Sequence, residues 1–330
     1  MPGLASLAPE DVMTARSLTA GAVVALALAG AWLEPSLAQR GGRGANTDAI
    51  KRKSLDLAYA TASPAQKLDL YLPNAGDGPF PVIVHIHGGA FRSGDKADGQ
   101  LTPVLQALEH GYAVASINYR LSGEAIFPAQ IHDVKAAIRW LRAHAREHTL
   151  DPARFAAWGG SAGGHLASLA GTSGGVSALE DLAMGNARES SRVQAVVDWF
   201  GPINFLTMDE QFTKSGIGRA DHNAAQSPES QLVGRQITIA TDAVSAASPA
   251  HYISPDDPPF FIQHGTKDPL VPTEQSIDFH GRLQAVLGRG RATLTLLEGA
   301  GHGGAMFSSP ENMAKVLAFL DSVLKDTMLK

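Results

Sequence analysis

The segment 155–170 constrains the fold of this chain more than any other, because a glycine-framed serine separates two apolar runs. The first run, 155–158, is typical of a buried strand, and the second, 166–170, is typical of a helix. Between them stands Gly159-Gly160-Ser161-Ala162-Gly163, the pattern G-x-S-x-G. A serine on so tight a turn adopts a strained backbone, and the flanking glycines remove β-carbons that would collide with neighbouring chain. The pattern predicts an exposed serine hydroxyl at a sheet edge, beside a helix N-terminus.

The rest of the chain alternates between strand-like and helix-like segments. The expected strands are 55–59, 68–72, 81–86, 112–117, 155–158, 193–200, 260–263 and 293–297, and the expected helices are 101–109, 129–144, 166–170, 274–287 and 310–325. The first two strands are expected to pair antiparallel at a sheet edge. This alternation predicts an α/β fold with a mostly parallel, doubly wound sheet of about eight strands. We expect residues 54–330 to form the folded domain, with the Ser-, Asp-, Gly- and Pro-containing stretch 203–250 as a cap or loop insertion over the sheet edge.

The first 38 residues have the three-part plan of a secretory signal. Arg16 precedes an apolar stretch, 18–33, and Ser36-Leu37-Ala38 offers small residues for cleavage after Ala38. An uncleaved anchor is the alternative, but the apolar run is shorter than the roughly 20 residues of a spanning helix. We therefore expect a protein exported to the periplasm or the medium, without stable membrane association after cleavage, and a flexible tether over 39–53.

One aspartate stands beyond the carboxyl end of an expected strand, where ligands bind in such sheets. Asp268 follows the strand 260–263 and lies between a glycine and two prolines. Asp256 and Asp257 precede that strand, at its opposite end, and Asp278 falls within the next helix. Asp268 is therefore the predicted catalytic acid.

A histidine follows the last expected strand on a glycine-rich loop. His302 stands in Gly299-Ala300-Gly301-His302-Gly303-Gly304. The resulting chain order of nucleophile, acid and base, Ser161, Asp268 and His302, is the order that a strand–turn–helix serine site requires. In this arrangement His302 takes the serine proton, while Asp268 holds the imidazole in the useful tautomer and stabilises its charged form.

A second glycine loop follows the strand 81–86 and reads His87-Gly88-Gly89-Ala90-Phe91. Glycines let backbone N–H groups turn toward a substrate oxygen. The predicted oxyanion hole consists of the amides of Gly89, Ala90 and Ala162, the last directly after the nucleophile.

Composition excludes several other kinds of site. The chain has no cysteine, so thiol nucleophiles, zinc–thiolate sites and disulfides are excluded. Its formal net charge of −5 disfavours nucleic acid as a partner. His85 and His87 alternate along one strand, but no third ligand accompanies them, so we expect no metal. No dinucleotide fingerprint or phosphate loop is present, so we expect no cofactor.

These stretches resemble the α/β-hydrolase esterases of the hormone-sensitive-lipase-like group, and especially the BD-FAE-like branch of acetylxylan and feruloyl esterases. The resemblance covers about 68–302 and is carried by 85–91 with 93–96, 115–121, 127–142, 158–165, 227–230 and 254–259. Ala90 departs from the glycine of much of the wider group. It still offers an N–H, although the departure weakens any expectation of bulky alcohol substrates.

The leading hypothesis is a secreted serine carboxylesterase for short-acyl or aryl esters, small or attached to plant polysaccharide. Phe91, Trp199 and Phe200 are the bulky residues expected to shape a small pocket, and the polar 203–250 segment offers no lipid-binding lid. A formamidase or peptidase that cleaves a C–N bond with the same triad is the alternative within the site. A binding protein on an inactive hydrolase fold is the alternative outside enzymes, and the complete triad argues against it.

Overall fold

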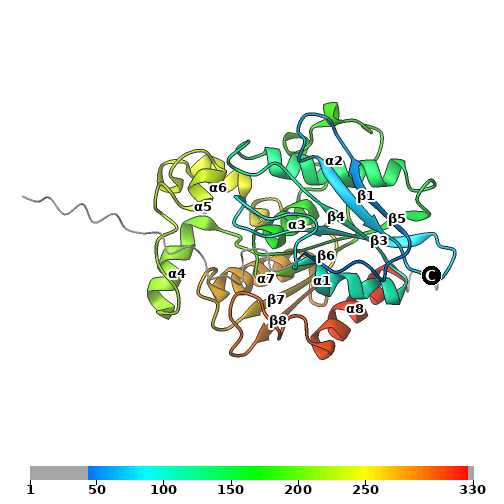
Figure 1. Cartoon of the computed structure of the whole chain (residues 1–330). Helices are drawn as coiled ribbons and strands as arrows, with labels where there is room; N and C mark the ends of the chain where they lie inside the picture. Colours follow the sequence, from blue (N-terminus) through cyan, green and yellow to red (C-terminus); the bar gives the residue numbers. More distant parts are fainter. Residues whose placement is uncertain (1–43, 326–330) are drawn as a thin grey trace, which may run out of the picture. The chain divides into compact units, whose positions relative to one another are not determined.

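The computed structural model describes residues 44–325, and every structural statement below concerns these residues. The sequence folds into one eight-stranded sheet with helices on both faces (Figure 1). The strands are β1 (Lys53–Ala58), β2 (Lys67–Tyr71), β3 (Phe80–Ile86), β4 (Ala113–Ile117), β5 (Leu150–Gly160), β6 (Ala195–Trp199), β7 (Phe260–Gly265) and β8 (Ala292–Leu297). The predicted signal segment, 1–38, lies outside the described residues.

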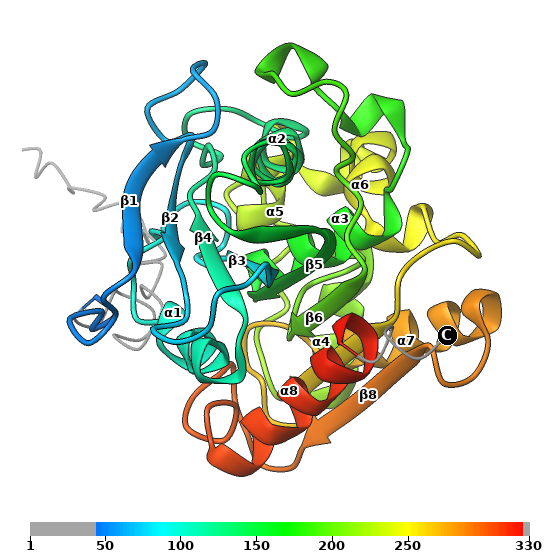
Figure 2. The same ribbon diagram turned by 90° about the vertical axis from the view of Figure 1, so that its right-hand side faces the viewer.

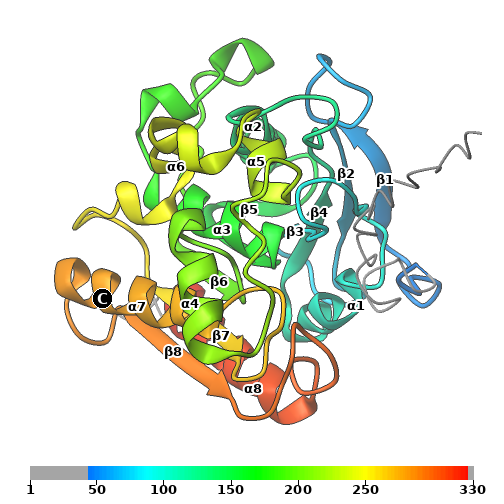
Figure 3. The ribbon, with the colours of Figure 1, turned by 90° about the vertical axis from the view of Figure 1, so that its left-hand side faces the viewer.

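The strand order is β1-β2-β4-β3-β5-β6-β7-β8. The pairs β1–β2 and β2–β4 are antiparallel, and all the other neighbours are parallel. In the middle of the sheet Val84 lies opposite Ala115 on one side and Ala157 on the other. The carboxyl ends of β3, β5, β6, β7 and β8 consequently meet at one edge, as the sequence predicted (Figures 2 and 3).

The longer helices match the predicted segments closely. They are α2 (Ala129–Ala143), α3 (Ala162–Thr172), α7 (Thr273–Leu287) and α8 (Pro310–Leu324). The expected helix at 101–109 is a four-residue α1 (Leu101–Val104) continued by a 3-10 helix, Leu105–His110. That helix ends at Gly111, whose φ of 73° only glycine adopts readily.

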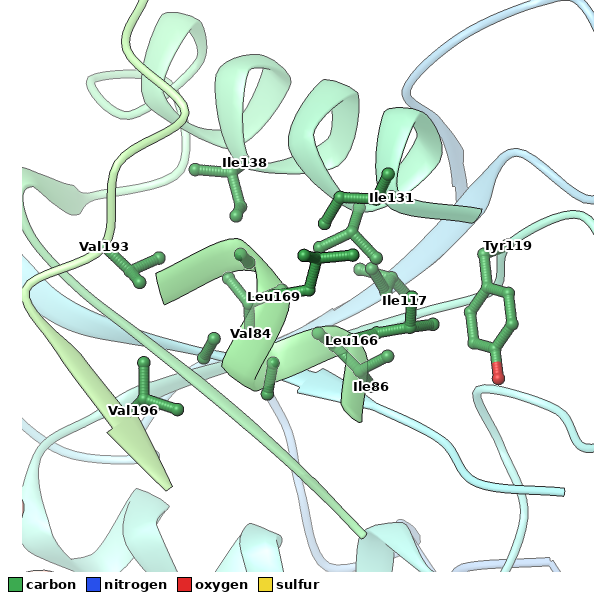
Figure 4. Packing of buried hydrophobic residues seen from close by; sticks show 14 of the residues in the cluster. Val84, Ile86, Ile117, Tyr119, Ile131, Ile138, Leu166, Leu169, Val193 and Val196 are labelled. Carbon is green, nitrogen blue, oxygen red and sulfur yellow. The ribbon is translucent and has the colours of Figure 1, made fainter. Parts of the chain in front are cut away.

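Alternation along the strands gives the sheet two apolar faces. Val84 and Ile86 of β3 point into a cluster with α2 and α3, whereas Ile83 points into a second cluster with α1 and α8. Figure 4 shows the first cluster, in which Leu166 and Leu169 of α3 pack among side chains of the sheet and of α2. A strand that is buried on both faces needs apolar side chains at consecutive positions, which explains why β3 contains so many valine and isoleucine residues.

The segment 203–250 is helical rather than a plain loop. It contains α4 (Met208–Ser215), α5 (Pro228–Leu232) and α6 (Thr241–Ala247), together with short 3-10 turns. Helices this short show no helical periodicity in the sequence, but their ends do leave signals. The Ser227 hydroxyl accepts from the amide of Ser230 and Pro228 opens α5, and Gly216 ends α4 with a φ of 66°.

Part of the predicted tether lies on the domain. Residues 44–52 form no helix or strand, but the Ala45 amide donates to the Ala97 carbonyl at 2.9 Å and Ile50 packs against the second cluster. Glycine and arginine content alone did not reveal these contacts. A bilayer-spanning helix would need a length and hydropathy that none of the helices between residues 44 and 325 combines.

Candidate active site

Ser161 occupies the turn between β5 and α3 with φ 57° and ψ −125°. Its amide donates to the Trp199 carbonyl at 2.8 Å, which fixes the turn to the end of β6. A β-carbon on Gly159 would lie 2.3 Å from the carbonyl carbon of Gly163, and one on Gly163 would lie 2.0 Å from the Ile86 oxygen. Both glycines are therefore required sterically, which is the reason that the sequence pattern suggested.

His302 and Asp268, which are 34 positions apart, meet beyond the ends of β7 and β8. The His302 Nδ1 lies 2.7 Å from the Asp268 Oδ2, and both side chains are almost fully buried. The other carboxylate oxygen, Oδ1, accepts the amides of Leu270 at 2.8 Å and Val271 at 3.0 Å. These bonds fix the carboxylate plane, so the carboxylate in turn fixes the Nδ1–H tautomer of His302.

The environment of Asp268 keeps its carboxylate ionised. Burial by itself raises the pKa, but the adjacent His302 and His264 outweigh burial and hold the pKa of Asp268 well below its usual range. His264 Nε2 is 3.2 Å from the Asp268 Oδ2, and His264 Nδ1 is 2.7 Å from the Ser276 hydroxyl. Sequence reasoning did not identify His264, although its place at the end of β7, four residues before Asp268, is a signal for it.

The three rival aspartates have other partners. Asp256 pairs with Arg192 at 2.8 Å, and Asp257 accepts hydrogen bonds from Ser254. Asp278 of α7 accepts from Gln211 at 3.2 Å. None of these contacts involves His302, so the geometry leaves Asp268 as the carboxylate that holds it.

Ser161 and His302 line one cavity of about 360 Å³. The Nε2 atom of His302 is buried and has no hydrogen-bond partner within residues 44–325. With Nδ1 held by Asp268, Nε2 is the basic nitrogen of the neutral ring and is free to take a proton. The other lining residues are His85, Asp98, Gly99, Gln100, Pro103, Val104, Trp158, Gly159, Gly160, Trp199, Phe200, Gly303, Gly304, Phe307 and Ser308.

The glycine loop after β3 passes directly beside the serine. A β-carbon on Gly88 would lie 3.3 Å from that of Ser161. Gly89 and Ala90 both have positive φ, 109° and 55°, and the described part of the chain offers no acceptor for their amides. Ala162 is the first residue of α3, so its amide has no intrahelical acceptor either.

Several hydrogen bonds fasten this loop to its neighbours. The Gly88 amide donates to the Gln100 side chain at 2.9 Å, and the Tyr119 hydroxyl donates to the His87 carbonyl at 3.0 Å. The Gly89 carbonyl accepts the amides of Arg92 and Ser93. Amides held in this way need little reorganisation to receive a developing negative charge.

Lys96 fastens the continuation of the loop to the edge of the sheet. Its ammonium group lies 2.9 Å from the Asp69 Oδ1 on β2 and 3.0 Å from the Asp56 Oδ1 on β1. Its carbonyl accepts the Ser116 hydroxyl at 2.7 Å, and its amide donates to the side chain of Asn118. The lysine side chain is largely buried, so the two carboxylates replace the water that would otherwise solvate its ammonium group.

Two of the three predicted pocket residues line the cavity. Trp199 and Phe200 do, but Phe91 does not: it is buried and packs edge-on against His165 and Phe205. The φ of 60° at Phe91 turns its side chain away from the direction that a regular strand end would give. The prediction for Phe91 as a pocket residue is therefore corrected.

His85 on β3 and His87 just after it do not form a metal-binding pair. His85 Nδ1 lies 2.9 Å from the Ser116 hydroxyl, whereas His87 Nδ1 lies 2.7 Å from the Gly88 carbonyl and its ring stacks on Tyr119. Within residues 44–325, no group of three or more His, Asp or Glu side chains is placed to hold a metal ion.

The chain matches known proteins over most of its length. The BD-FAE family model matches residues 68–283. "Probable carboxylic ester hydrolase LipM" of Mycobacterium tuberculosis is 34% identical over 234 residues, which cover 70% of this chain and 52% of that protein. The chain thus spans about half the length of the curated relatives that it matches.

Two solved structures are similar to the described fold. A bifunctional GH43-CE protein from Bacteroides eggerthii superposes with a TM-score of 0.74 at 37% identity, covering 82% of this chain and 35% of that one. A truncated carbohydrate esterase from gut microbiota superposes with a TM-score of 0.75 at 31% identity, covering 85% of this chain and 99% of that one.

Proposed function

Because the chain belongs to the BD-FAE family of α/β-hydrolase esterases, we propose that it hydrolyses carboxylic esters with Ser161 as nucleophile, His302 as general base and Asp268 as the residue that orients His302. One observation carries the proposal. The Asp268 carboxylate lies 2.7 Å from the His302 Nδ1, and the other ring nitrogen of His302, Nε2, has no partner. His302 and Ser161 line the same cavity. A base held in this way and a serine on a strained turn are the two parts that acyl transfer needs.

The reaction takes place in two halves. The Ser161 oxygen attacks the ester carbonyl carbon as its proton passes to His302 Nε2, and the amides of Gly89, Ala90 and Ala162 receive the negative charge on the carbonyl oxygen. His302 then gives the proton to the departing alcohol, which leaves an acyl group on Ser161. Water activated by His302 attacks this acyl group, and the acid is released.

The proposed substrates are short-acyl or aryl esters, including those attached to carbohydrate. One of the two similar structures is that of a carbohydrate esterase from gut microbiota, which supports the carbohydrate arm of the proposal. The cavity volume of about 360 Å³ is at the lower end of the range for small-molecule sites, which supports the small size.

The decisive experiment compares matched ester and amide substrates. Purified protein is given p-nitrophenyl acetate and p-nitroacetanilide, together with N-formylkynurenine, and the rates are compared with those of the Ser161→Ala variant. We expect ester hydrolysis that depends on Ser161 and exceeds the amide rates by orders of magnitude. Faster turnover of either amide would replace the esterase proposal with an amidase, and activity that is unchanged in the variant would remove Ser161 from the mechanism.

The proposal includes export, which rests on the sequence of residues 1–38. Expression with the complete leader in a Gram-negative host followed by N-terminal sequencing tests it. Export predicts a mature chain that begins at or near Gln39. An intact Met1 or Met13 in the purified protein would contradict it.

A further inference from the structure

A glutamine at the rim of the active-site cavity holds the loop that carries the predicted oxyanion amides. The Gln100 Oε1 accepts the Gly88 amide at 2.9 Å, and this hydrogen bond is partly buried although Gln100 itself is exposed. Gln100 directly precedes α1 and lines the cavity together with Ser161 and His302. The contact therefore joins the α1 side of the cavity to the loop after β3.

The backbone of Gly88 packs closely against both this glutamine and the serine turn. A β-carbon on Gly88 would lie 2.8 Å from the Gln100 Oε1 and 2.8 Å from the Gly160 carbonyl oxygen. It would also lie 3.3 Å from the β-carbon of Ser161. All three atoms surround the position where a side chain would begin, so the loop, the glutamine and the serine turn meet at Gly88. A change at Gln100 therefore affects the point where the loop contacts the serine turn.

Asp98 determines which way the side-chain amide of Gln100 points. The Asp98 Oδ2 accepts the Gln100 Nε2 at 3.0 Å, and the Asp98 Oδ1 accepts the main-chain amide of Gln100 at 2.8 Å. A carboxylate can only accept and the Gly88 amide can only donate, so the Gln100 oxygen must face Gly88 and its nitrogen must face Asp98. Glutamate at this position would lack the donor for Asp98, and methionine would supply neither partner.

The next two residues along the loop supply two of the three predicted oxyanion amides. Gly89 and Ala90 follow Gly88 directly and have positive φ, 109° and 55°. Glycine backbone rotates at little cost, so a hydrogen bond at Gly88 limits how far these amides can turn. Oxyanion stabilisation depends on donors that are in place before the charge develops. Loss of the Gln100 bond should therefore weaken the oxyanion hole, while the other hydrogen bonds of the loop keep it folded.

We propose that Gln100 is a positioning residue, which holds the loop after β3 so that the amides of Gly89 and Ala90 can receive the charge of the tetrahedral intermediate. Asp98 acts through Gln100 by orienting its side-chain amide. In this role neither residue touches the reacting atoms, so the expected effect is on kcat more than on KM. The inference rests on the proposed esterase function, since the oxyanion hole serves that reaction.

A pair of substrates that differ in one atom tests the oxyanion hole directly. p-Nitrophenyl acetate is compared with its thiono analogue, in which sulfur replaces the carbonyl oxygen, and the measured quantity is the ratio of kcat/KM for the oxygen ester to that for the sulfur ester. Sulfur accepts hydrogen bonds weakly, so the thiono ester gains less from the loop amides. We expect this ratio to be roughly fivefold lower in Gln100→Met than in the wild type, the change that loss of one hydrogen bond gives. The kcat for p-nitrophenyl acetate should fall by a similar factor, and the pH profile of kcat/KM should keep its shape.

Two further variants separate positioning from general damage. Gln100→Glu keeps an acceptor for the Gly88 amide but offers no donor to Asp98, so its ratio should lie between those of the wild type and Gln100→Met. Asp98→Asn leaves Gln100 in place but has a single side-chain oxygen for the two Gln100 donors, so its ratio should also fall partway. Gln226→Met, at an exposed glutamine before α5, is the matched control and should keep the wild-type ratio.

The outcomes distinguish this inference from the proposed function. A folded Gln100→Met that keeps the wild-type ratio would overturn the role of Gln100 while the esterase proposal stands. An equal loss of activity toward both esters would do the same, because general damage leaves the ratio unchanged. A wild-type protein that hydrolyses no ester at all would overturn the proposed function instead. Thermal unfolding of each variant shows whether Gln100→Met folds, and Gln100→Glu and Asp98→Asn keep the test valid if it does not.

Discussion

The aromatic ring of Phe200 lies 4.5 Å from the imidazole of His302, with the two planes tilted by 55°. Phe200 directly follows Trp199, whose carbonyl accepts the amide of Ser161. The turn after β6 therefore touches both the serine turn and the histidine ring. Phe200 itself has a φ of 46°, so the backbone is held in a disfavoured conformation at the point where these contacts meet.

Replacing the proposed nucleophile should abolish ester hydrolysis. Ser161→Ala removes the attacking oxygen, and we expect kcat to fall by roughly 10⁶-fold. Alanine tolerates the turn about as well as serine does, so the variant should unfold at nearly the wild-type temperature. Residual activity above a few per cent, measured with p-nitrophenyl acetate on folded protein, would show that another residue attacks.

Changing the carboxylate that holds His302 should cost about 10⁴-fold in kcat. In Asp268→Asn the side-chain oxygen can still accept the amides of Leu270 and Val271, but the amide nitrogen then faces His302 and favours the wrong tautomer. Asp256→Asn is the matched control, because Asp256 is exposed and pairs with Arg192. A comparable loss in the control alone would transfer the catalytic acid to Asp256.

The pH dependence of kcat/KM should follow a single group. The pKa of Asp268 is held far below its usual range by His302 and His264, which outweigh burial, so this carboxylate stays ionised from pH 5 to 9. His302 must be neutral to accept the serine proton. We expect kcat/KM for p-nitrophenyl acetate to rise with pH through one ionisation and then level off. Rates that do not change between pH 5 and 9 would exclude His302 as the base.

Lengthening the acyl chain of the substrate beyond four carbons should not increase kcat/KM. A pocket that receives an alkyl chain gains about 0.8 kcal/mol for each buried methylene. Here a long alkyl chain would instead cover the unpartnered Nε1 of Trp199 without supplying a hydrogen-bond acceptor to it. We expect kcat/KM for p-nitrophenyl esters to level off or fall beyond butyrate in the series acetate, butyrate, octanoate and palmitate. A maximum at octanoate or longer would indicate a lipase.

The free energy of unfolding should depend on pH in part because of Asp257. Burial raises the pKa of Asp257 to about 6, although hydrogen bonds from Ser254 oppose the change. The unfolded chain ionises this group near its ordinary value of about 3.9. Between these two values the folded state binds more protons, so this residue's contribution to the free energy of unfolding decreases as the pH rises from about 4 to about 6.

Urea unfolding of the wild type and of Asp257→Asn at pH 4 and at pH 7 measures this contribution. Asparagine keeps an acceptor for Ser254 and does not ionise. The variant should therefore gain stability relative to the wild type as the pH increases. A difference between the two proteins that is the same at both pH values would contradict the raised pKa.

The sequence predicted the sheet and the contact between Asp268 and His302 because both depend on local patterns. Each of the eight strands was expected, the first two from apolar alternation, and the glycines around Ser161 and at 88–89 are where close approach demands them. Asp268 and His302 could be chosen because both follow strands whose ends meet at one edge of a parallel sheet. The structure places these two residues in contact.

The cavity wall was not predictable in the same way. His85, Trp158 and Phe307 become neighbours through strand register and through the loop after β8, which no local pattern specifies. The short helices α4, α5 and α6 lacked enough turns to show a period. Phe91 was assigned to the pocket on its position in the chain, but its left-handed backbone directs the ring into the core.

Lys96 ties the first two strands of the sheet to the loop that carries the predicted oxyanion amides. Its two carboxylate partners belong to β1 and β2, yet its own segment continues the loop that carries the predicted oxyanion amides. Fraying of this sheet margin would release the loop before the central strands separate. During gradual denaturation, activity should then be lost before the circular dichroism signal. Activity would in that case measure whether β1 and β2, which lie away from Ser161, are still folded.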